Sequence, residues 1–320
     1  MDFTFFMTFV PRLNIRNPVV IGYEKCTPKN IELLKAYEGQ NFIHSGNWWG
    51  IDPTKRTLEI VLENQERFYS EKTVGFMSLN TPASLTNYDY WNISKAIREK
   101  AIQQCLDNAN WAIEHRNVKV PIYCSLEVST YEEARVWFRK AREFSHECFC
   151  RGVAEFLRDP KIRKKGIQTI FELTIGARSV LEDAPFHISG LSSLYLLPII
   201  AYLGCTSVDG STPITSALAR GTVYTSDGKG MKIRDLKDWN CSCEFCANFE
   251  GNVVEEFNEN RLARVQHNIA IFQEKVNIIK SCKDKRELAE IIKNEVSQTA
   301  SKYYQQRWEQ ALELEQKFLK

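Results

Sequence analysis

Short apolar runs alternate with longer stretches of helical periodicity through the first two-thirds of the chain. Each run is almost continuously apolar and closes with glycine or a polar residue, as strands buried on both faces of a parallel sheet do. Helical patterns between the runs include Lys55–Glu71, Tyr90–Arg116 and Tyr131–Leu157. The predicted strands are Pro18–Tyr23, Asn41–Gly46, Thr73–Leu79, Val120–Leu126, Ile170–Gly176, Phe186–Gly190 and Cys205–Gly210.

This repetition of strand and helix is typical of a (β/α)8 TIM barrel. Seven units in about 200 residues fit a barrel in which one strand is weak or missed, and an open doubly wound sheet is the competing fold. Past Gly221 the pattern predicts a short strand, a glycine turn, a second strand and a basic helix. Two long helices then follow, at about Val253–Ser281 and Asp284–Leu319. We therefore expect a barrel at residues 1–220, a subdomain at 221–281 that contains a cluster of cysteines, and a C-terminal helix at 282–320.

The composition of the 320 residues is ordinary for a soluble globular protein, with 43% hydrophobic and 26% charged residues. A net charge of +2 does not by itself indicate a nucleic-acid partner. The apolar run Phe3–Val10 lacks the basic start and cleavage site of a signal peptide, and Leu194–Cys205 is too short to span a bilayer. We expect a cytoplasmic protein without a membrane partner, so its ten cysteines do not imply disulfides.

Three cysteines lie close together, and a histidine follows after twenty intervening residues. Cys241, Cys243 and Cys246 with His267 form a familiar tetrahedral zinc set. The periodicity of its helix places His267 opposite the main apolar stripe, where a compact zinc loop would pack. Buried or redox-active cysteines are the alternative. A site with four protein ligands is closed, so one Zn²⁺ per chain would be structural and the chemistry would lie elsewhere.

Four segments resemble the tRNA-guanine transglycosylase superfamily, whose members exchange a guanine in a nucleic acid for a 7-deazaguanine. The family's zinc segment, in its archaeal style, resembles KIRDLKDWNCSCEFCANF together with LARVQHNIAIFQEKVNII. The segment that leads to the family's aspartate nucleophile resembles FHISGLSSLYLLPIIAYLGCTSVDGSTPITSALARGTVYT. Two weaker matches are FIHSGNWWG and ELTIGARSVL. The resemblance implies a (β/α)8 barrel with a zinc subdomain and a ping-pong reaction through a covalent sugar–enzyme intermediate.

The resemblance assigns the nucleophile to Asp209, a carboxylate at a predicted strand end beside Gly210. The alternative is an aspartate that caps the following helix, since DGSTP also suits a helix start. His44 stands where the family has an acid–base aspartate. A histidine can move protons near neutral pH but supplies no fixed negative charge, so it is an acid–base candidate or a residue that only orients Asp209.

The resemblance also implies contacts with the base and sugar. Trp48 is expected to stack on the base, with Trp49 as the fallback and a core tryptophan as the alternative. Glu127 stands where the family has a base-reading glutamine, and Asn80 is the nearest polar substitute for a base-reading aspartate. Gly176 would let the backbone approach the base. The complete set of expected substrate contacts is Ser45, Gly46, Trp48, Asn80, Glu127, Gly176, His187 and Gly190.

The resemblance leaves the kind of nucleic acid open. The segment after His267 is too short for the extra RNA-binding domain of archaeal tRNA enzymes, so we expect DNA rather than tRNA as the partner, with a 7-deazaguanine base as co-substrate. The basic segments Arg158–Gly166 and Lys229–Lys237 could bind phosphates, although either can be a solvated surface. Competing classes are a tRNA enzyme, a non-catalytic nucleic-acid-binding subunit and a zinc-stabilised barrel with unrelated chemistry. Members of the family form dimers, and the sequence leaves open whether this protein is also a homodimer.

Overall fold

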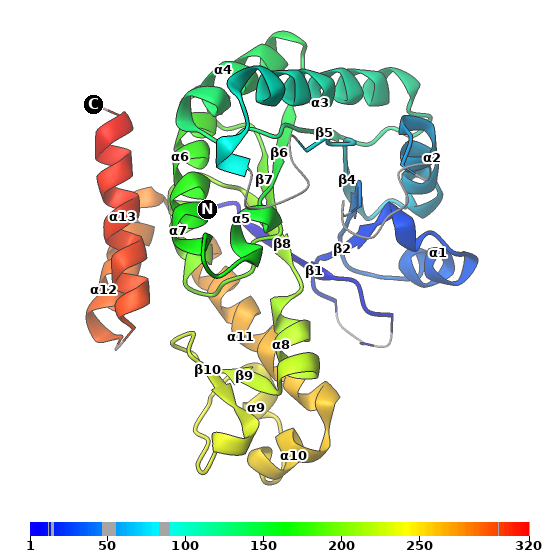
Figure 1. Cartoon of the computed structure of the whole chain (residues 1–320). Coiled ribbons are helices and arrows are strands. Elements are labelled where there is room, and N and C mark those ends of the chain that lie inside the picture. Colours follow the sequence, from blue (N-terminus) through cyan, green and yellow to red (C-terminus); the bar gives the residue numbers. More distant parts are fainter. Residues whose placement is uncertain (12, 14–15, 47–55, 83–89, 300, 320) are drawn as a thin grey trace.

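Eight parallel strands close into a barrel in the order in which they follow in the chain (Figure 1). The structure is a computed structural model that describes residues 1–11, 13, 16–46, 56–82, 90–299 and 301–319. Parallel pairing of the first and last strands closes the barrel, with Thr4 opposite Ser207 and Met7 opposite Gly210. The predicted (β/α)8 fold is therefore confirmed. The strands are β1 (Thr4–Thr8), β2 (Val19–Gly22), β3 (Asn41–His44), β4 (Thr73–Met77), β5 (Ile122–Ser125), β6 (Cys148–Gly152), β7 (Phe186–Ser189) and β8 (Ser207–Gly210).

Helices follow β2 to β8 and cover the outside of the barrel (Figure 1). Several begin at a threonine or serine whose hydroxyl accepts a hydrogen bond from the backbone three residues on, as Thr27, Ser94 and Thr130 do. No helix within the described ranges is both long and apolar enough to cross a membrane. The helices of the barrel are α1 (Pro28–Lys35), α2 (Leu58–Phe68), α3 (Lys95–His115), α4 (Tyr131–Glu143), α5 (Ala154–Arg158), α6 (Arg163–Leu181), α7 (Leu196–Tyr202) and α8 (Thr212–Arg220).

The predicted strand at Ile170–Gly176 is wrong, because these residues form the centre of α6. Helix α6 is buried on most of its surface, and a short run of buried apolar residues cannot be told from a strand by periodicity. Two of the eight strands, β1 and β6, were not predicted. β1 lies in the N-terminal apolar run, and β6 lies within the segment Tyr131–Leu157 that was predicted as one helix. That segment breaks after α4, where Ser145 has a positive φ of 62°.

The interior of the barrel is filled by side chains from successive strands. Phe6, Val20, Phe42, Met77 and Cys150 form one buried cluster. The ring of Phe42 lies 5.6 Å from that of Phe6, centre to centre. These side chains plug the barrel, so the polar groups at the strand ends lie above an apolar floor.

Beyond the barrel, a hairpin and short helices form a separate group beside α8, and two helices pack against α6 and α7 (Figure 1). The predicted pair of strands is confirmed, whereas the basic helix after it is only a single 3-10 turn, Ile233–Asp235. Each predicted long helix is two helices. The first breaks at Asn260, which ends one helix and caps the next with its side chain. The elements are β9 (Thr222–Tyr224), β10 (Gly230–Lys232), α9 (Glu244–Ala247), α10 (Val253–Glu259), α11 (Arg261–Ser281), α12 (Lys285–Gln298) and α13 (Lys302–Phe318).

Candidate active site and metal centre

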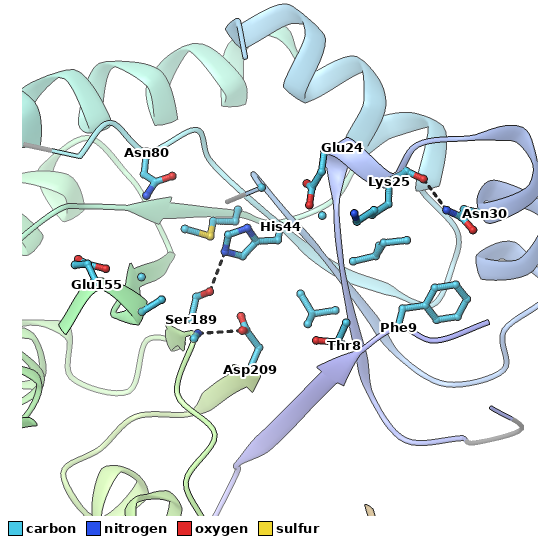
Figure 2. Close-up of a pocket in the computed structure, with 18 of the residues that line it drawn as sticks. Thr8, Phe9, Glu24, Lys25, Asn30, His44, Asn80, Glu155, Ser189 and Asp209 are labelled. Carbon is cyan, nitrogen blue, oxygen red and sulfur yellow. Dashed lines mark hydrogen bonds between the residues drawn. The ribbon is translucent and has the colours of Figure 1, made fainter. Parts of the chain in front are cut away.

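A cavity of about 390 Å³ opens at the carboxyl ends of the barrel strands (Figure 2). This is the end at which parallel barrels place their chemistry. The sequence-predicted residues that line it are His44, Gly46, Asn80, Gly190 and Asp209. The structure adds side chains that the sequence analysis did not select, among them Glu24, Lys25, Glu155 and Ser189.

Asp209 is held at both carboxylate oxygens. His187 Nε2 lies 2.9 Å from Oδ2, and the backbone N–H of Gly190 donates to Oδ1 at 3.0 Å. Burial opposes ionisation of Asp209, but the hydrogen bond and charge of His187 outweigh it and hold the pKa below its ordinary value. The N-cap position of α8 is Ser211, and both oxygens of Asp209 are engaged elsewhere. Asp209 is therefore a fixed, ionised carboxylate and not a helix cap.

His187 lies behind Asp209, away from the cavity wall. It is fully buried, its ring centre lies 4.7 Å from that of Phe42, and its Nδ1 lies 2.9 Å from Ser207 Oγ. This position differs from the expected substrate contact, because the side chain points into the barrel and reaches the neighbouring strand. The structure thus brings His187 to the carboxylate and not to the cavity.

His44 lines the cavity, with its Nε2 2.8 Å from Ser189 Oγ (Figure 2). Burial lowers the pKa of His44 to about 4, although the negative charge of Asp209 works in the opposite direction. The imidazole is therefore neutral near pH 7. In that form it can donate or accept a hydrogen bond and can accept a proton, but it is not a general acid.

Asn80 is the cavity-facing end of a buried polar network. Its amide nitrogen donates to one carboxylate oxygen of Glu127, and Arg56 Nη2 donates to its amide oxygen at 3.1 Å. The other oxygen of Glu127 lies 2.7 Å from Arg151 Nη1. Glu127 is 3% exposed and does not line the cavity. The structure places it behind Asn80, where it orients that side chain and does not itself line the cavity.

The end of β6 contributes cavity residues that the sequence analysis missed. Gly152 and Glu155 line the cavity, and the carboxylate of Glu155 lies 2.6 Å from Arg151 Nη2. Burial raises the pKa of Glu155 to about 7, with the nearby charge of Glu127 adding to it and Arg151 opposing it. The signal in the sequence is the apolar run Cys148–Cys150, which is followed by Arg151 and Gly152 and lies inside a predicted helix.

Gly176 does not reach the cavity. A Cβ atom at this position would lie 2.3 Å from the backbone oxygen of Tyr131, so the glycine allows α6 to pack closely against α4. The cavity is instead lined by another glycine, Gly152, which ends strand β6. Trp48 and its fallback Trp49 lie outside the described residues.

The strand-end pair after β3 is placed beside the cavity. Ser45 is fully buried, and its hydroxyl lies 3.4 Å from the amide oxygen of Asn80. Gly46 lines the cavity with a φ of 82°, and a Cβ there would lie 2.5 Å from the ring of Tyr23. Both positive φ and close packing require glycine at this point.

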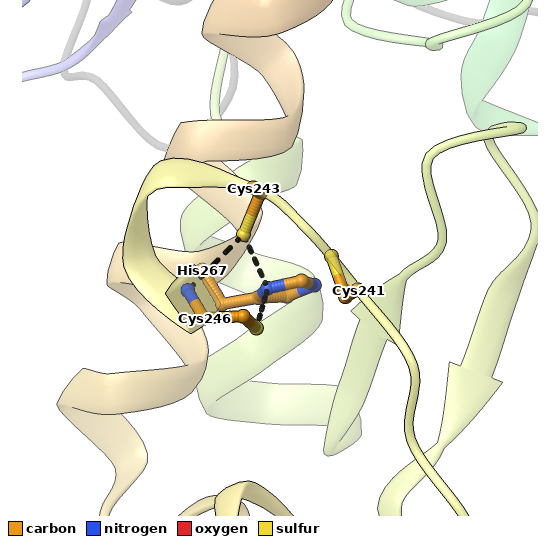
Figure 3. Close-up of side chains that lie close together, drawn as sticks. All are labelled: Cys241, Cys243, Cys246 and His267. Atoms are coloured by element: carbon orange, nitrogen blue, oxygen red, sulfur yellow. Dashed lines mark hydrogen bonds between the residues drawn. The ribbon is translucent and has the colours of Figure 1, made fainter. Parts of the chain in front are cut away.

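The four predicted metal ligands converge (Figure 3). The ligand atoms of Cys241, Cys243, Cys246 and His267 all lie within 4.8 Å of one another. His267 Nδ1 lies 3.3 Å from Cys243 Sγ and 3.4 Å from Cys246 Sγ, close to the roughly 3.5 Å that tetrahedral zinc imposes between sulfur and nitrogen ligands. These residues could therefore hold a metal ion.

The surroundings of His267 fit a ligand role. Its Nε2 lies 2.7 Å from the backbone oxygen of Tyr224, which fixes the tautomer with Nδ1 free for an ion. Burial lowers the pKa of His267, which favours the neutral, ligating form. Among the thiols, hydrogen bonds from Cys243 and Cys246 lower the pKa of Cys241 to about 2, so one thiolate is stabilised by the other two. A cation would allow all three to ionise.

The residue after His267 ties this centre to α8, the helix that follows Asp209. Asn268 donates from its amide nitrogen to the backbone oxygens of Pro213 and Thr222, each at 3.0 Å. Its amide oxygen accepts from the backbone N–H of Tyr224 at 3.0 Å. The cysteine–histidine cluster, the hairpin and α8 are therefore joined through one turn of α11.

The fold and the site define a barrel protein with a fixed carboxylate at its strand ends and a cysteine–histidine cluster outside the barrel. Two named proteins share sequence with the chain. It is 22% identical over 220 residues to the tRNA-guanine(15) transglycosylase of Methanocaldococcus jannaschii, and 24% identical over 203 residues to that of Methanococcus vannielii. This similarity supports a place in the tRNA-guanine transglycosylase superfamily, whose members are glycosyltransferase-type enzymes.

The matches cover 64% and 59% of this chain but only 32% and 30% of the two relatives. The chain thus matches about a third of the length of these relatives. No protein-family model matches the chain.

Proposed function

We propose that the protein exchanges guanine for a 7-deazaguanine in DNA, through a covalent bond between Asp209 and the sugar. The observation that carries this proposal is the charge and the fixed position of the Asp209 carboxylate. It is ionised and fixed by His187 and Gly190 at the wall of a cavity large enough for a purine.

In the first half-reaction, a carboxylate oxygen of Asp209 attacks C1′ of the target nucleotide. The bond from C1′ to N9 of guanine breaks, and guanine leaves with the bonding electrons and takes up one proton. In the second half, N9 of the incoming base attacks C1′, loses its proton and displaces Asp209. The sugar changes partner twice, so its configuration is retained and the carboxylate is regenerated.

A proton must be given to the leaving base and taken back from the incoming one. Glu155 suits this role, because its carboxyl group lines the cavity and its pKa of about 7 allows both protonation states near neutral pH. His44, with a pKa near 4, is better suited to hydrogen-bond the substrate or Ser189 than to supply the proton. The acid–base role expected for His44 thus moves to Glu155 in this proposal.

Exposed basic residues at the end of α5 and the start of α6 offer contacts to the phosphate backbone. Lys161, Arg163, Lys164 and Lys165 are exposed, on the same strand-end connection as Glu155. The ammonium group of Lys165 lies 4.5 Å from the ring centre of Trp91. Such a cluster suits sequence-independent binding of a nucleic-acid strand next to the cavity.

Duplex DNA and tRNA are the two candidate substrates. The similarity to the tRNA enzymes covers about a third of their length. The names of the relatives favour tRNA as the alternative substrate.

We also propose that the metal ion is zinc, bound once per chain by Cys241, Cys243, Cys246 and His267. Three thiolates and one imidazole are a common zinc set, and four protein ligands leave no open position for a substrate. The ion would supply structural stability to the hairpin and α11. All reaction steps above are carried by residues of the cavity.

The decisive experiment incubates the protein separately with duplex DNA and bulk tRNA in the presence of radiolabelled guanine. We expect label to enter DNA, and a denaturation-resistant adduct to form with wild-type protein but not with Asp209→Asn. Label in tRNA alone would assign the alternative substrate. Absence of both label and adduct on either nucleic acid, with folded protein, would refute the exchange reaction.

A further inference from the structure

The hydrogen-bonding state of Asn80 is fixed by its neighbours. An amide has one acceptor and one donor end, and the two are hard to distinguish by shape alone. Here a carboxylate of Glu127, which only accepts when ionised, faces one end, and the guanidinium of Arg56, which only donates, faces the other. The amide nitrogen must therefore face Glu127 and the amide oxygen must face Arg56.

Counting donors and acceptors shows what Asn80 can still offer. Its amide oxygen already receives Arg56 Nη2 at 3.1 Å and has the Ser45 hydroxyl at 3.4 Å, so both lone pairs are used. One of its two N–H groups donates to Glu127. Within the described part of the chain, no partner takes the second N–H. Asn80 lies on the cavity wall (Figure 2), so it offers the cavity a donor.

The network that holds this donor is itself anchored. Arg151 forms an ion pair with the carboxylate oxygen of Glu127 that Asn80 does not contact. Arg151 is fully buried, and its Nε donates to the backbone oxygen of Val128 at 2.7 Å. A flip of the amide would place its N–H groups against Arg56 and its oxygen against a carboxylate. Both contacts would be repulsive, so the donor is locked in place.

We infer that Asn80 is a specificity residue that donates a hydrogen bond to the carbonyl oxygen at C6 of the exchanged base. This inference rests on the proposed function. Guanine and 7-deazaguanines share two ring-edge acceptors, the C6 oxygen and N3, and N3 adjoins the bond to the sugar that Asp209 attacks. The acceptor that can lie away from Asp209 is the C6 oxygen. The site would therefore select 6-oxopurines and their 7-deaza analogues.

The test measures base binding without catalysis. Equilibrium dialysis with radiolabelled guanine, competed by 6-thioguanine, compares two bases that differ only in oxygen or sulfur at C6, and sulfur is the weaker acceptor. We expect wild-type protein to prefer guanine by roughly tenfold, as one buried hydrogen bond allows. Asn80→Asp should bring the ratio near one. Asn30→Asp, which makes the same change elsewhere on the cavity wall, should leave the ratio unchanged.

Asn80→Asp places a second carboxylate beside Glu127 and could unfold the protein, so Asn80→Ala is the companion variant. It removes the donor without adding charge and should lower the ratio in the same way, with folding checked by thermal unfolding. A tenfold ratio that survives in Asn80→Ala, or equal binding of both bases to wild type, would overturn the inference alone. No guanine binding to wild type would overturn the proposed base site and this inference together.

Discussion

Replacing His187 by phenylalanine should raise the pKa of Asp209 and shift the pH dependence of covalent bond formation. The phenyl ring fits among the aromatic neighbours Phe6 and Phe42, so the barrel interior stays filled. The change removes the hydrogen bond of 2.9 Å to Oδ2 and leaves Asp209 with the Gly190 N–H as its remaining described donor.

The size of the shift follows from the lost interaction. A hydrogen bond to a charged group contributes about 1.5–3 kcal/mol, and 1.36 kcal/mol corresponds to one pKa unit, so the pKa of Asp209 should rise by about 1–2 units. In the wild type it lies below its ordinary value of 3.8. A carboxylate must be ionised to attack, so a raised pKa moves the acidic limb of the rate profile to higher pH.

The assay is single-turnover formation of the protein–nucleic-acid adduct between pH 4.5 and 8. Wild-type protein should show no limb from Asp209 in this range, whereas His187→Phe should lose rate toward the acidic end of the range. His146→Phe is the matched control, since His146 is also buried but bonds to Asn110 at 2.8 Å. If His187→Phe keeps the wild-type acidic flank, His187 does not set the ionisation of Asp209.

Three further predictions concern stability and the metal. Cys243→Ser should reduce bound zinc, measured by metal analysis, from about one per chain to well below one. It should also lower the melting temperature, measured by calorimetry. Full zinc content in this variant would contradict the four-ligand site. Arg151→Met should cost about 3–5 kcal/mol of unfolding free energy by leaving two carboxylates without their cation, and denaturant titration that shows less than 1 kcal/mol would refute the buried network. Gly176→Ala should cost about 1–3 kcal/mol because its Cβ meets Tyr131, whereas Gly152→Ala, with nothing within 4 Å of its Cβ, should unfold at the wild-type midpoint.

The strand ends were the part of the site that the sequence could predict. His44, Asn80 and Asp209 each close an apolar run, and a parallel barrel brings such positions to one rim. The cysteine spacing predicted the cysteine–histidine cluster because the three thiols need only a local turn to meet, and His267 joins them from helix α11.

The remaining residues depend on contacts between distant segments. Nothing in the sequence around Arg151 shows that it joins Glu127 to Glu155, because three different elements contribute to that network. The role of His187 likewise depends on the register of β7 against β8, which places its ring beside Asp209. The apolar run in α6 was mistaken for a strand because burial on all sides removes the periodicity that separates the two structures.

The closure of the barrel by β1 and β8 constrains how the chain folds during synthesis. β1 can reach only one of its two neighbours until Ser207–Gly210 has left the ribosome, about two hundred residues later. Until then, one edge of the N-terminal strand and the open edge of the growing sheet are both unpaired, and such edges favour association with other chains. Asp209 lies within the closing strand, so this carboxylate reaches its hydrogen-bond partners in the same step that completes the sheet. Under the proposed reaction, a nascent chain would therefore be inactive until the barrel is closed.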